Sequence, residues 1–353
     1  MTTFGSQSFF MIHTLQILRG IAALLVVFYH VRTHVIIPHD SWFYVFASIG
    51  YAGVNLFFII SGFIMCYTTG SHNNPWKFIG RRLVRIVPLY WLLLLFHTGV
   101  HSLTDPQTYL SMLFIPLEPD MPPFLGYATW VVGWTLNYEM FFYLLFFVSL
   151  FVGRYRYVLV FTILAALHVL FIYLSGVGFL QSFDPYTDLP SVDSAYLYMI
   201  VSPMMLLFAV GMIAAFVYKR FKACPDGYNI ATLLLSAFGI VVFFVFMNFD
   251  GHGVQTSFFC LMLFVAALSV ERFITNNRYV LRSIQPFVYL GTISYSIYLL
   301  HLLFIGNFHI PELPLPEWMK ILMVVAATII ASAFSYEMIE KRLSGRLKRL
   351  LRI

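Results

Sequence analysis

Apolar runs of about 20 residues recur along nearly the whole chain, and each is long enough to cross the hydrocarbon core of a bilayer as a helix. The sequence predicts ten such spans. They lie near residues 12–34, 47–69, 82–102, 126–150, 157–177, 194–217, 229–248, 254–271, 287–308 and 318–337. The polar stretches between them are only loop-sized, and none can bury a core of its own. The chain is therefore predicted to be a single all-α integral membrane domain over 1–353, with no fused soluble domain.

The composition agrees with a multi-pass membrane protein. Of the 353 residues, 60% are hydrophobic and only 10% are charged, whereas soluble proteins carry about 25% charged residues. The three cysteines, Cys66, Cys224 and Cys260, lie on separate segments and lack the spacing of metal ligands. No metal site and no disulfide are therefore predicted. Residues 248–253 fit either a full loop between the seventh and eighth spans or a re-entrant break.

The charges between the spans predict the orientation of the chain. Connections after the second, fourth, sixth and eighth spans are basic, as at Arg154 and Arg156, whereas those after the third, fifth, seventh and ninth are acidic, as at Asp184 and Asp188. Because basic loops stay in the cytoplasm, both termini are predicted to be cytoplasmic. The net charge of +6 then reflects topology and indicates no nucleic-acid partner. Residues 340–353 are predicted to form a basic amphipathic helix on the lipids of the inner leaflet.

Arg19 and His30 are two polar residues inside the first predicted span, where both are costly. They are eleven residues apart, so on a helix they share one face, with a separation of about 16 Å along the axis. An imidazole titrates near neutral pH and suits a general base, so His30 is predicted to be catalytic. Arg19 either takes part in the site or extends its guanidinium group to the inner headgroups.

Three arginines enter the third span from the cytoplasmic side. Arg81, Arg82 and Arg85 lie three and four residues apart, so two of them can share a helix face. Guanidinium groups bind phosphates through paired hydrogen bonds, which predicts a phosphate site here. The alternative is an ordinary cytoplasmic anchor for the span.

Glu139 lies near the middle of the predicted span 126–150, where a carboxylate is rare and usually faces a partner or a wet cavity. A site role is predicted for it, with His30 as the partner whose tautomer it would fix. The alternative is a structural ion pair with an arginine.

Two further spans carry polar residues. In the second span, small residues near Asn55 and Ser61 are predicted to serve close helix packing, with hydrogen bonds from those two side chains. In the ninth span, Ser294, Tyr298 and His301 form a polar stripe on one helix face. The sequence leaves open whether this stripe lines a site or packs against another helix.

Five motifs in this order resemble those of the membrane-bound acyltransferase-3 family, which includes O-antigen, Nod-factor and exopolysaccharide acetyltransferases. The motifs are Arg19-x10-His30, Asn55-Leu-Phe-Phe-Ile-Ile-Ser61-Gly62-Phe63, Arg81-Arg82-x-x-Arg85-x-x-Pro88-x-Tyr90-Trp91, Trp134-Thr-Leu-x-x-Glu139 and Ser294-Tyr-Ser-Ile-Tyr298-Leu-x-His301. The resemblance covers nearly the whole chain, and the exopolysaccharide-modifying branch is the most similar.

This resemblance implies a ten-helix enzyme of the bacterial inner membrane that transfers an acyl group, usually acetyl, from acetyl-CoA to a carbohydrate hydroxyl. The acceptor would be an exopolysaccharide, an O-antigen or a lipid-linked sugar, and acetyl-CoA would be a cosubstrate with no metal required. The implied catalytic residues are His30, Glu139 and Arg19. Residues implied to bind the donor are Arg81, Arg82, Arg85 and Arg19, and those implied to bind the acceptor are Trp134, Asn55, Tyr298 and His301.

Several alternatives stay open at this point. His30 can activate the acceptor hydroxyl directly, or it can carry the acyl group as a transient acyl-imidazole. Buried Arg, His and Glu side chains also fit a proton-coupled transporter or flippase of an anionic or lipid-linked sugar. The sequence does not choose between acetyl and longer acyl groups, between the two sides of the membrane, or between a monomer and a homo-oligomer.

Overall fold

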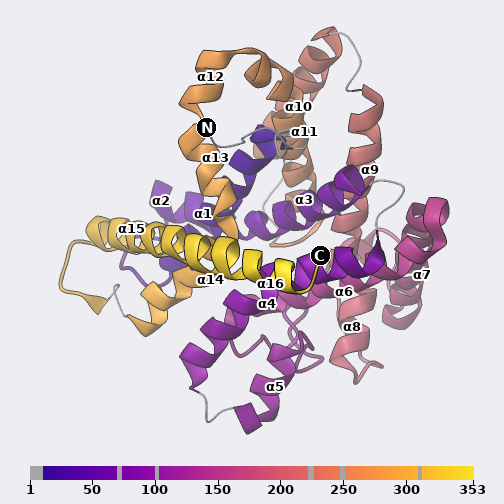
Figure 1. The fold of residues 1–353 in the computed structure, drawn as a ribbon, viewed down its shortest axis with the longest axis horizontal. Coiled ribbons are helices and arrows are strands. Elements are labelled where there is room, and N and C mark those ends of the chain that lie inside the picture. The colour runs from indigo at the N-terminus through magenta and orange to yellow at the C-terminus, as the bar shows by residue number, and fades with distance from the viewer. Residues whose placement is uncertain (1–10, 70–73, 100–102, 222–225, 247–250, 309–311) are drawn as a thin grey trace.

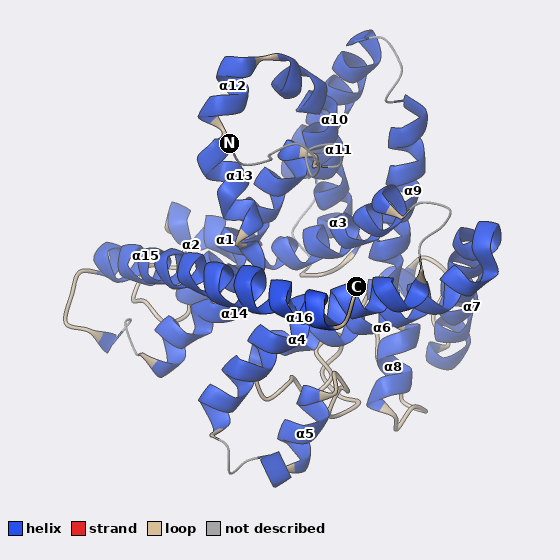
Figure 2. Ribbon diagram, in the orientation of Figure 1, coloured by secondary structure: helices blue, strands red, loops and turns tan. Residues whose placement is uncertain are grey.

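The computed structural model describes residues 11–69, 74–99, 103–221, 226–246, 251–308 and 312–353, and this part of the chain contains helices and no strands (Figures 1 and 2). The α-helices are α1 (His13–Val31), α2 (Trp42–Ser48), α3 (Ala52–Thr68), α4 (Pro75–Thr98), α5 (Pro106–Met112), α6 (Trp134–Ser149), α7 (Arg156–Ser175), α8 (Ala195–Val201), α9 (Leu206–Phe221), α10 (Asp226–Phe246), α11 (Val254–Asn276), α12 (Arg278–Ser283), α13 (Gln285–Thr292), α14 (Ser294–Leu302), α15 (Glu317–Ser335) and α16 (Ser344–Leu350). Two π-helical segments, Leu303–Asn307 and Tyr336–Leu343, extend α14 and α15.

Six helical stretches in the described residues are long and apolar enough to cross a membrane. They are His13–Val31, Trp42–Thr68, Val131–Ser175, Pro203–Arg220, Val254–Asn276 and Glu317–Leu350. The pair α13 and α14, which is bent by 60°, makes a seventh if it counts as one span. These helices confirm the prediction of an all-helical, multi-pass membrane protein.

The number of ten spans and the cytoplasmic position of both termini stay predictions. Two predicted spans are joined in Val131–Ser175, with a non-helical kink at Gly153 between them. The helix α4 is 24 residues long, but three arginines lie within it. The apolar part of α10, residues 229–245, falls just short of a typical span. Residues 248–250 of the expected loop or break at 248–253 lie outside the described residues.

The helix α3 lies at the centre of the bundle, between α1, α9 and α11 (Figure 1). Its contact with α9 depends on two glycines. A Cβ atom built on Gly62 would lie 2.1 Å from the carbonyl oxygen of Phe208, and one on Gly211 would lie 1.9 Å from that of Ile59. The backbones therefore approach too closely for any side chain, as the small residues of the second predicted span indicated.

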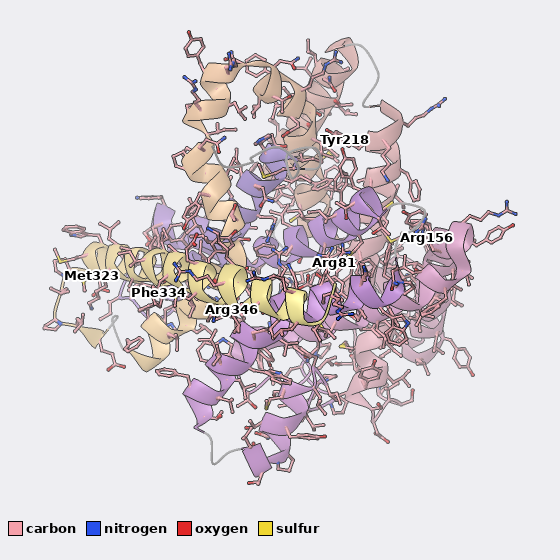
Figure 3. The ribbon with its side chains drawn as sticks, in the orientation of Figure 1. Arg81, Arg156, Tyr218, Met323, Phe334 and Arg346 are labelled. Atoms are coloured by element: carbon pink, nitrogen blue, oxygen red, sulfur yellow. The ribbon has the colours of Figure 1, made fainter. Side chains whose placement is uncertain are left out.

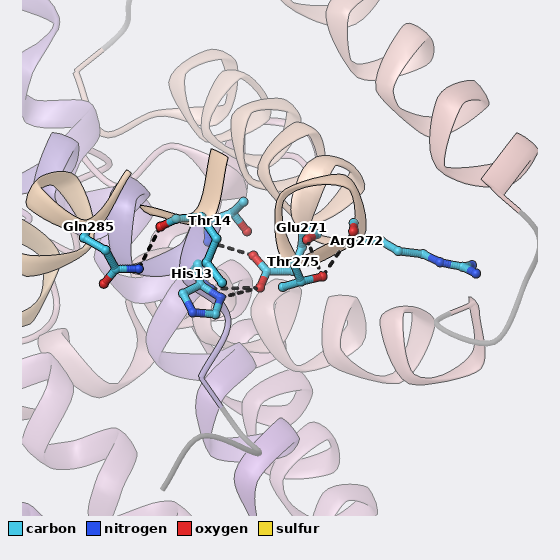
Figure 4. A network of polar contacts seen from close by, with 7 residues as sticks. His13, Thr14, Glu271, Arg272, Thr275 and Gln285 are labelled. Carbon is cyan, nitrogen blue, oxygen red and sulfur yellow. Dashed lines mark hydrogen bonds and ion pairs between the residues drawn. The ribbon is translucent and has the colours of Figure 1, made fainter. Parts of the chain in front are cut away.

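The start of α1 is fixed by a buried carboxylate from α11 (Figure 4). The backbone N–H groups of His13 and Thr14 donate to Glu271 Oε1 and Oε2, at 3.0 and 2.8 Å. These amides have no partner within their own helix, so the carboxylate satisfies them and interacts favourably with the helix dipole. Glu271 thereby fixes the depth and rotation of the helix that carries Arg19 and His30.

The C-terminal segment continues α15 as one helical stretch, Glu317–Leu350. Figure 3 shows Met323, Phe334 and Arg346 along its length. Beyond the π-helical segment it packs on α4, where the Ser344 hydroxyl donates to the Val84 carbonyl at 2.8 Å. The segment 340–353, predicted as a helix on the leaflet surface, thus has one side against α4. Contact of its basic side chains with lipid stays a prediction.

We expect Gly211→Ala to lower the apparent Tm of the detergent-purified protein by several degrees. The added methyl group forces α3 and α9 apart, and overpacking of this kind costs about 1–3 kcal/mol. Differential scanning fluorimetry measures the shift. The matched control is Gly345→Ala, also in a helix, where nothing lies within 4 Å of the new Cβ atom. Equal Tm values for the two variants would contradict this packing.

Candidate active site

A cavity of about 100 Å³ lies between α1, α3, α4, α6 and α14. Its polar lining combines cations, a carboxylate and hydroxyl groups. These residues are Arg19, Ser61, Arg82, Arg85, Thr135, Glu139, Tyr143, Ser294, Tyr295 and Tyr298. The remaining lining is apolar, so the polar groups interact in surroundings of low dielectric constant, where electrostatic interactions are strong.

The structure shows which arginines reach the cavity. Arg82 and Arg85 are three residues apart and line it from α4, and Arg19 lines it from α1. Arg81 lies on another side of α4, is exposed, and is not among the lining residues (Figure 3). The structure therefore brings together three of the four arginines predicted to bind the donor and leaves Arg81 outside.

The guanidinium groups in the cavity have few protein partners. Arg85 forms no hydrogen bond or ion pair with any described residue, and Arg82 contacts only the rings of Phe78 and Tyr143, at 5.6 and 5.5 Å. Arg19 donates once, to Gln16 Oε1 at 3.2 Å. Buried charged donors usually find partners. Most of these donors are thus available to a bound anion.

Glu139 lies in this cavity and not beside His30. Its carboxylate accepts hydrogen bonds from the Ser61 hydroxyl at 3.2 Å and from the Tyr143 hydroxyl. The contact expected between Glu139 and His30 does not occur, because α6 turns Glu139 toward the arginines. The sequence predicted Glu139 near the middle of a span, but depth alone does not determine which neighbouring helix a side chain faces.

A second carboxylate, Glu340, was missed in the sequence because it stands at the start of a basic tail. It accepts a hydrogen bond from Ser296 Oγ at 2.6 Å and lies within electrostatic range of Arg85 and Arg19. It belongs to the π-helical segment after α15, and such segments are frequent at functional sites. Three cations and two carboxylates, Glu139 and Glu340, leave one net positive charge around the cavity (three minus two).

The broken helix brings another unpartnered donor to the cavity. The helix α14 begins at Ser294, after the 60° bend, and Ser294 lines the cavity. The Ser294 hydroxyl is buried and has no hydrogen-bond partner among the described residues. Because the N-terminal end of a helix carries partial positive charge, this end of α14 adds to the preference of the cavity for an anion.

His30 pairs with His301 outside the cavity lining. His30 Nδ1 lies 2.9 Å from the Val26 carbonyl oxygen and 3.2 Å from His301 Nε2. A carbonyl oxygen only accepts hydrogen bonds, which assigns the proton to Nδ1 and leaves the lone pair on Nε2. His30 Nε2 forms no hydrogen bond with any described residue. This nitrogen is therefore free to accept a proton from a substrate.

Tyr298 lies between the arginine-lined cavity and the histidine pair. It lines the cavity, and its ring centroid is 6.3 Å from that of His301 and 5.8 Å from that of Phe57. Its hydroxyl lies 2.8 Å from Thr135 Oγ1 and donates to the Val132 carbonyl at 3.1 Å. The polar stripe of α14 thus lines the site, and Tyr298 connects its two halves.

Asn55 and Trp134 contact another histidine, His252, for which no role was predicted from the sequence. Asn55 donates through Nδ2 to the His252 carbonyl at 3.2 Å, and its Oδ1 lies 2.8 Å from His252 Nδ1. The Trp134 ring lies 5.4 Å from the His252 ring. Asn55 is fully buried and Trp134 is 5% exposed, so in this structure both position His252. The only sequence signal for His252 was the suspected break at 248–253.

Comparison with known proteins shows the family of the chain. A family profile described as an acyltransferase domain matches residues 12–337. The chain belongs to the acyltransferase-3 family. The matched region contains Arg19, His30, Arg82, Arg85 and Glu139. Membership of this family favours an acyltransferase over the transporter or flippase that the sequence left open.

Two relatives extend the comparison. The chain is 32% identical over 271 residues to the exopolysaccharide production protein ExoZ of Rhizobium meliloti (strain 1021), covering 72% of this chain and 76% of that protein. It is 26% identical over 347 residues to a protein of Acidianus two-tailed virus that is named provisionally as acetyltransferase ORF330, covering 94% of this chain and 92% of that protein. No solved structure matches the chain.

We expect Glu139→Ala to lower the apparent Tm by on the order of 5 °C, because the three arginines lose a counter-charge inside the bundle. Inorganic pyrophosphate or coenzyme A should restore part of the loss by binding the arginines. Thermal-shift measurements with and without these anions test this. The control is Glu337→Ala, which removes only the surface pair of Glu337 with Lys341. Equal stability of the two variants would show that Glu139 does not balance the arginines.

Proposed function

We propose that this protein is a membrane O-acyltransferase that moves an acyl group, most simply acetyl, from acyl-CoA on the cytoplasmic side to a hydroxyl of a carbohydrate. The observation that carries the proposal is the set of unpartnered guanidinium donors in the cavity, near a histidine whose Nε2 is free. The guanidinium groups can bind the phosphates of an acyl donor, and the histidine nitrogen can accept the proton of an alcohol acceptor. The similarity to ExoZ supports an exopolysaccharide-type acceptor.

In this mechanism Arg82 and Arg85 bind the phosphates of the donor, with Arg19 and the Ser294 hydroxyl as further donors in the same cavity. The arm that carries the thioester passes Tyr298 toward His30. Holding the donor in this way converts the transfer into a reaction between groups already in place, which is a large part of catalysis. Glu139 and Glu340 hold the arginines by charge and do not contact the reacting atoms.

His30 acts as the general base. Its Nε2 removes the proton from the acceptor hydroxyl while the hydroxyl oxygen attacks the thioester carbonyl carbon. The tetrahedral intermediate collapses, the carbon–sulfur bond breaks, and the leaving thiolate takes the proton from His30. The Val26 carbonyl and His301 Nε2 face the Nδ1–H of the transient imidazolium. His301 therefore takes the orienting role that the sequence gave to Glu139.

The proposal includes the predicted membrane topology. We take the protein to cross a bacterial inner membrane ten times, with both termini in the cytoplasm. The α4 arginines then face the cytoplasm, where acyl-CoA is available. His30 then lies further from the cytoplasm on the same helix as Arg19, about 16 Å along the axis.

We expect His30→Ala to lower acyl transfer by about 100-fold or more, because the general base is lost. The assay incubates membranes with radiolabelled acetyl-CoA and polysaccharide extracted from cells that lack the gene, and counts label in the polysaccharide. Binding of acetyl-CoA should change little, since the arginines are intact. The control, His39→Ala, alters an exposed histidine in the turn before α2 and should keep activity.

The same assay separates the two catalytic routes. Incubation of the wild-type protein with labelled acetyl-CoA and no acceptor should leave no label on the protein if His30 is a general base. Label that remains on the protein and depends on His30 indicates an acyl-imidazole intermediate. Near-normal transfer by His30→Ala would contradict both routes.

A further inference from the structure

Aromatic side chains form a second cluster next to His30, and none of the cavity arginines belongs to it. The Tyr29 ring lies 5.3 Å from the His30 imidazole and 5.8 Å from the Tyr51 ring. The contacts continue from Tyr51 to His252 at 5.9 Å. We call the following set the aromatic cluster: Tyr29, Tyr51, Phe124, Tyr127, Trp134, Tyr186 and His252.

His252 is the fixed centre of the cluster. Asn55 holds it through two contacts, as described above, and the His252 backbone N–H donates to the Tyr186 hydroxyl at 3.1 Å. The rings of Phe124 and Tyr186 lie 5.9 and 6.4 Å from the His252 ring. Tyr127 stacks on Phe124 at 4.8 Å. Segments from five parts of the chain thus meet in the aromatic cluster.

The outer rings of the cluster are accessible. Tyr186 is 38% exposed, and Tyr29 and Tyr127 are half-buried, whereas His252 and Trp134 are buried beneath them. The hydroxyls of Tyr29 and Tyr127 form no hydrogen bond with any described residue, and the two phenols lie within electrostatic range of each other. Partial burial raises the pKa of Tyr186 to about 12, so its hydroxyl stays protonated and can donate.

The chemistry of the cluster differs from that of the cavity. It offers ring faces and phenol hydroxyls. The guanidinium carbon of Arg32 lies 3.8 Å from the Tyr29 ring centroid, and the Asp184 carboxylate lies within electrostatic range of Tyr186. A phosphate has little to bind here, and a hydrocarbon chain would leave the hydroxyls unused. A pyranose ring fits both features, since its C–H groups pack on aromatic faces and its hydroxyls exchange hydrogen bonds with phenols.

We propose that the aromatic cluster is the acceptor subsite and that it stacks a pyranose ring of the carbohydrate with one hydroxyl directed at His30 Nε2. This inference rests on the proposed function, because His30 must be the base. In this proposal the acceptor contacts the half-buried rings of Tyr29 and Tyr127 and the exposed ring of Tyr186, in place of the buried Asn55 and Trp134. The donor and the acceptor then bind to different groups of residues that meet at His30.

The test measures steady-state acetyl transfer with Tyr127→Ala, varying each substrate separately. The acceptor is the polysaccharide extracted from cells lacking the gene, and the donor is radiolabelled acetyl-CoA. We expect the acceptor KM to rise about tenfold, the change that loss of one stacking contact gives. The KM for acetyl-CoA should stay within about twofold of wild type, since Tyr127 is not part of the arginine-lined cavity. Tyr127→Phe, which keeps the ring, should recover most of the acceptor affinity.

The matched control is Tyr173→Ala, which removes a tyrosine that is 81% exposed on α7 and should leave both KM values unchanged. If Tyr127→Ala does not fold, Tyr186→Ala replaces it with the same expectation. An unchanged acceptor KM, or equal changes in both KM values, overturns the acceptor subsite. If wild-type protein does not label the polysaccharide at all, the proposed function fails instead.

Discussion

The burial of charge inside an apolar helical bundle is the constraint on which this structure depends. An unpaired guanidinium group in such surroundings is costly, and the cost falls only when a counter-charge or a bound anion is close. Glu139 supplies one counter-charge from α6, and Glu340 supplies another from the C-terminal segment. The bend between α13 and α14 and the π-helical segment after α15 bring Ser294 and Glu340 to the same place. Both irregular helical segments thus lie beside the buried charges.

The site has two halves with different chemistry. The arginine-lined cavity favours an anion, and the histidine pair presents a free base nitrogen next to aromatic rings. Tyr298 lies between the halves and is held by Thr135 and the Val132 carbonyl. This arrangement suits an enzyme that must join a phosphate-bearing donor to an uncharged acceptor, because each partner is recognised by the chemistry that fits it.

The sequence predicted the fold class and singled out several residues that line the cavity, because both depend on local patterns. Hydrophobic length predicted membrane helices, and helical spacing predicted that two of the three α4 arginines share a face, without saying which two. The partners of these residues depend on how helices pack, which spacing does not encode. The predicted contact between Glu139 and His30 was therefore wrong, and the structure instead pairs His30 with His301. Glu340 and His252 were missed because a tail and a loop carry no periodic signal that indicates what they will contact.

The most direct measurement of the central claim compares the affinities of coenzyme A and of pantetheine, which lacks the phosphates, for the purified protein. Wild-type protein should bind coenzyme A at least about tenfold more tightly, as expected for charge-assisted hydrogen bonds to phosphate. That preference should disappear in the double variant Arg82→Ala/Arg85→Ala and persist in Arg81→Ala, whose side chain lies outside the cavity lining. A preference for coenzyme A that survives in the double variant would contradict the account.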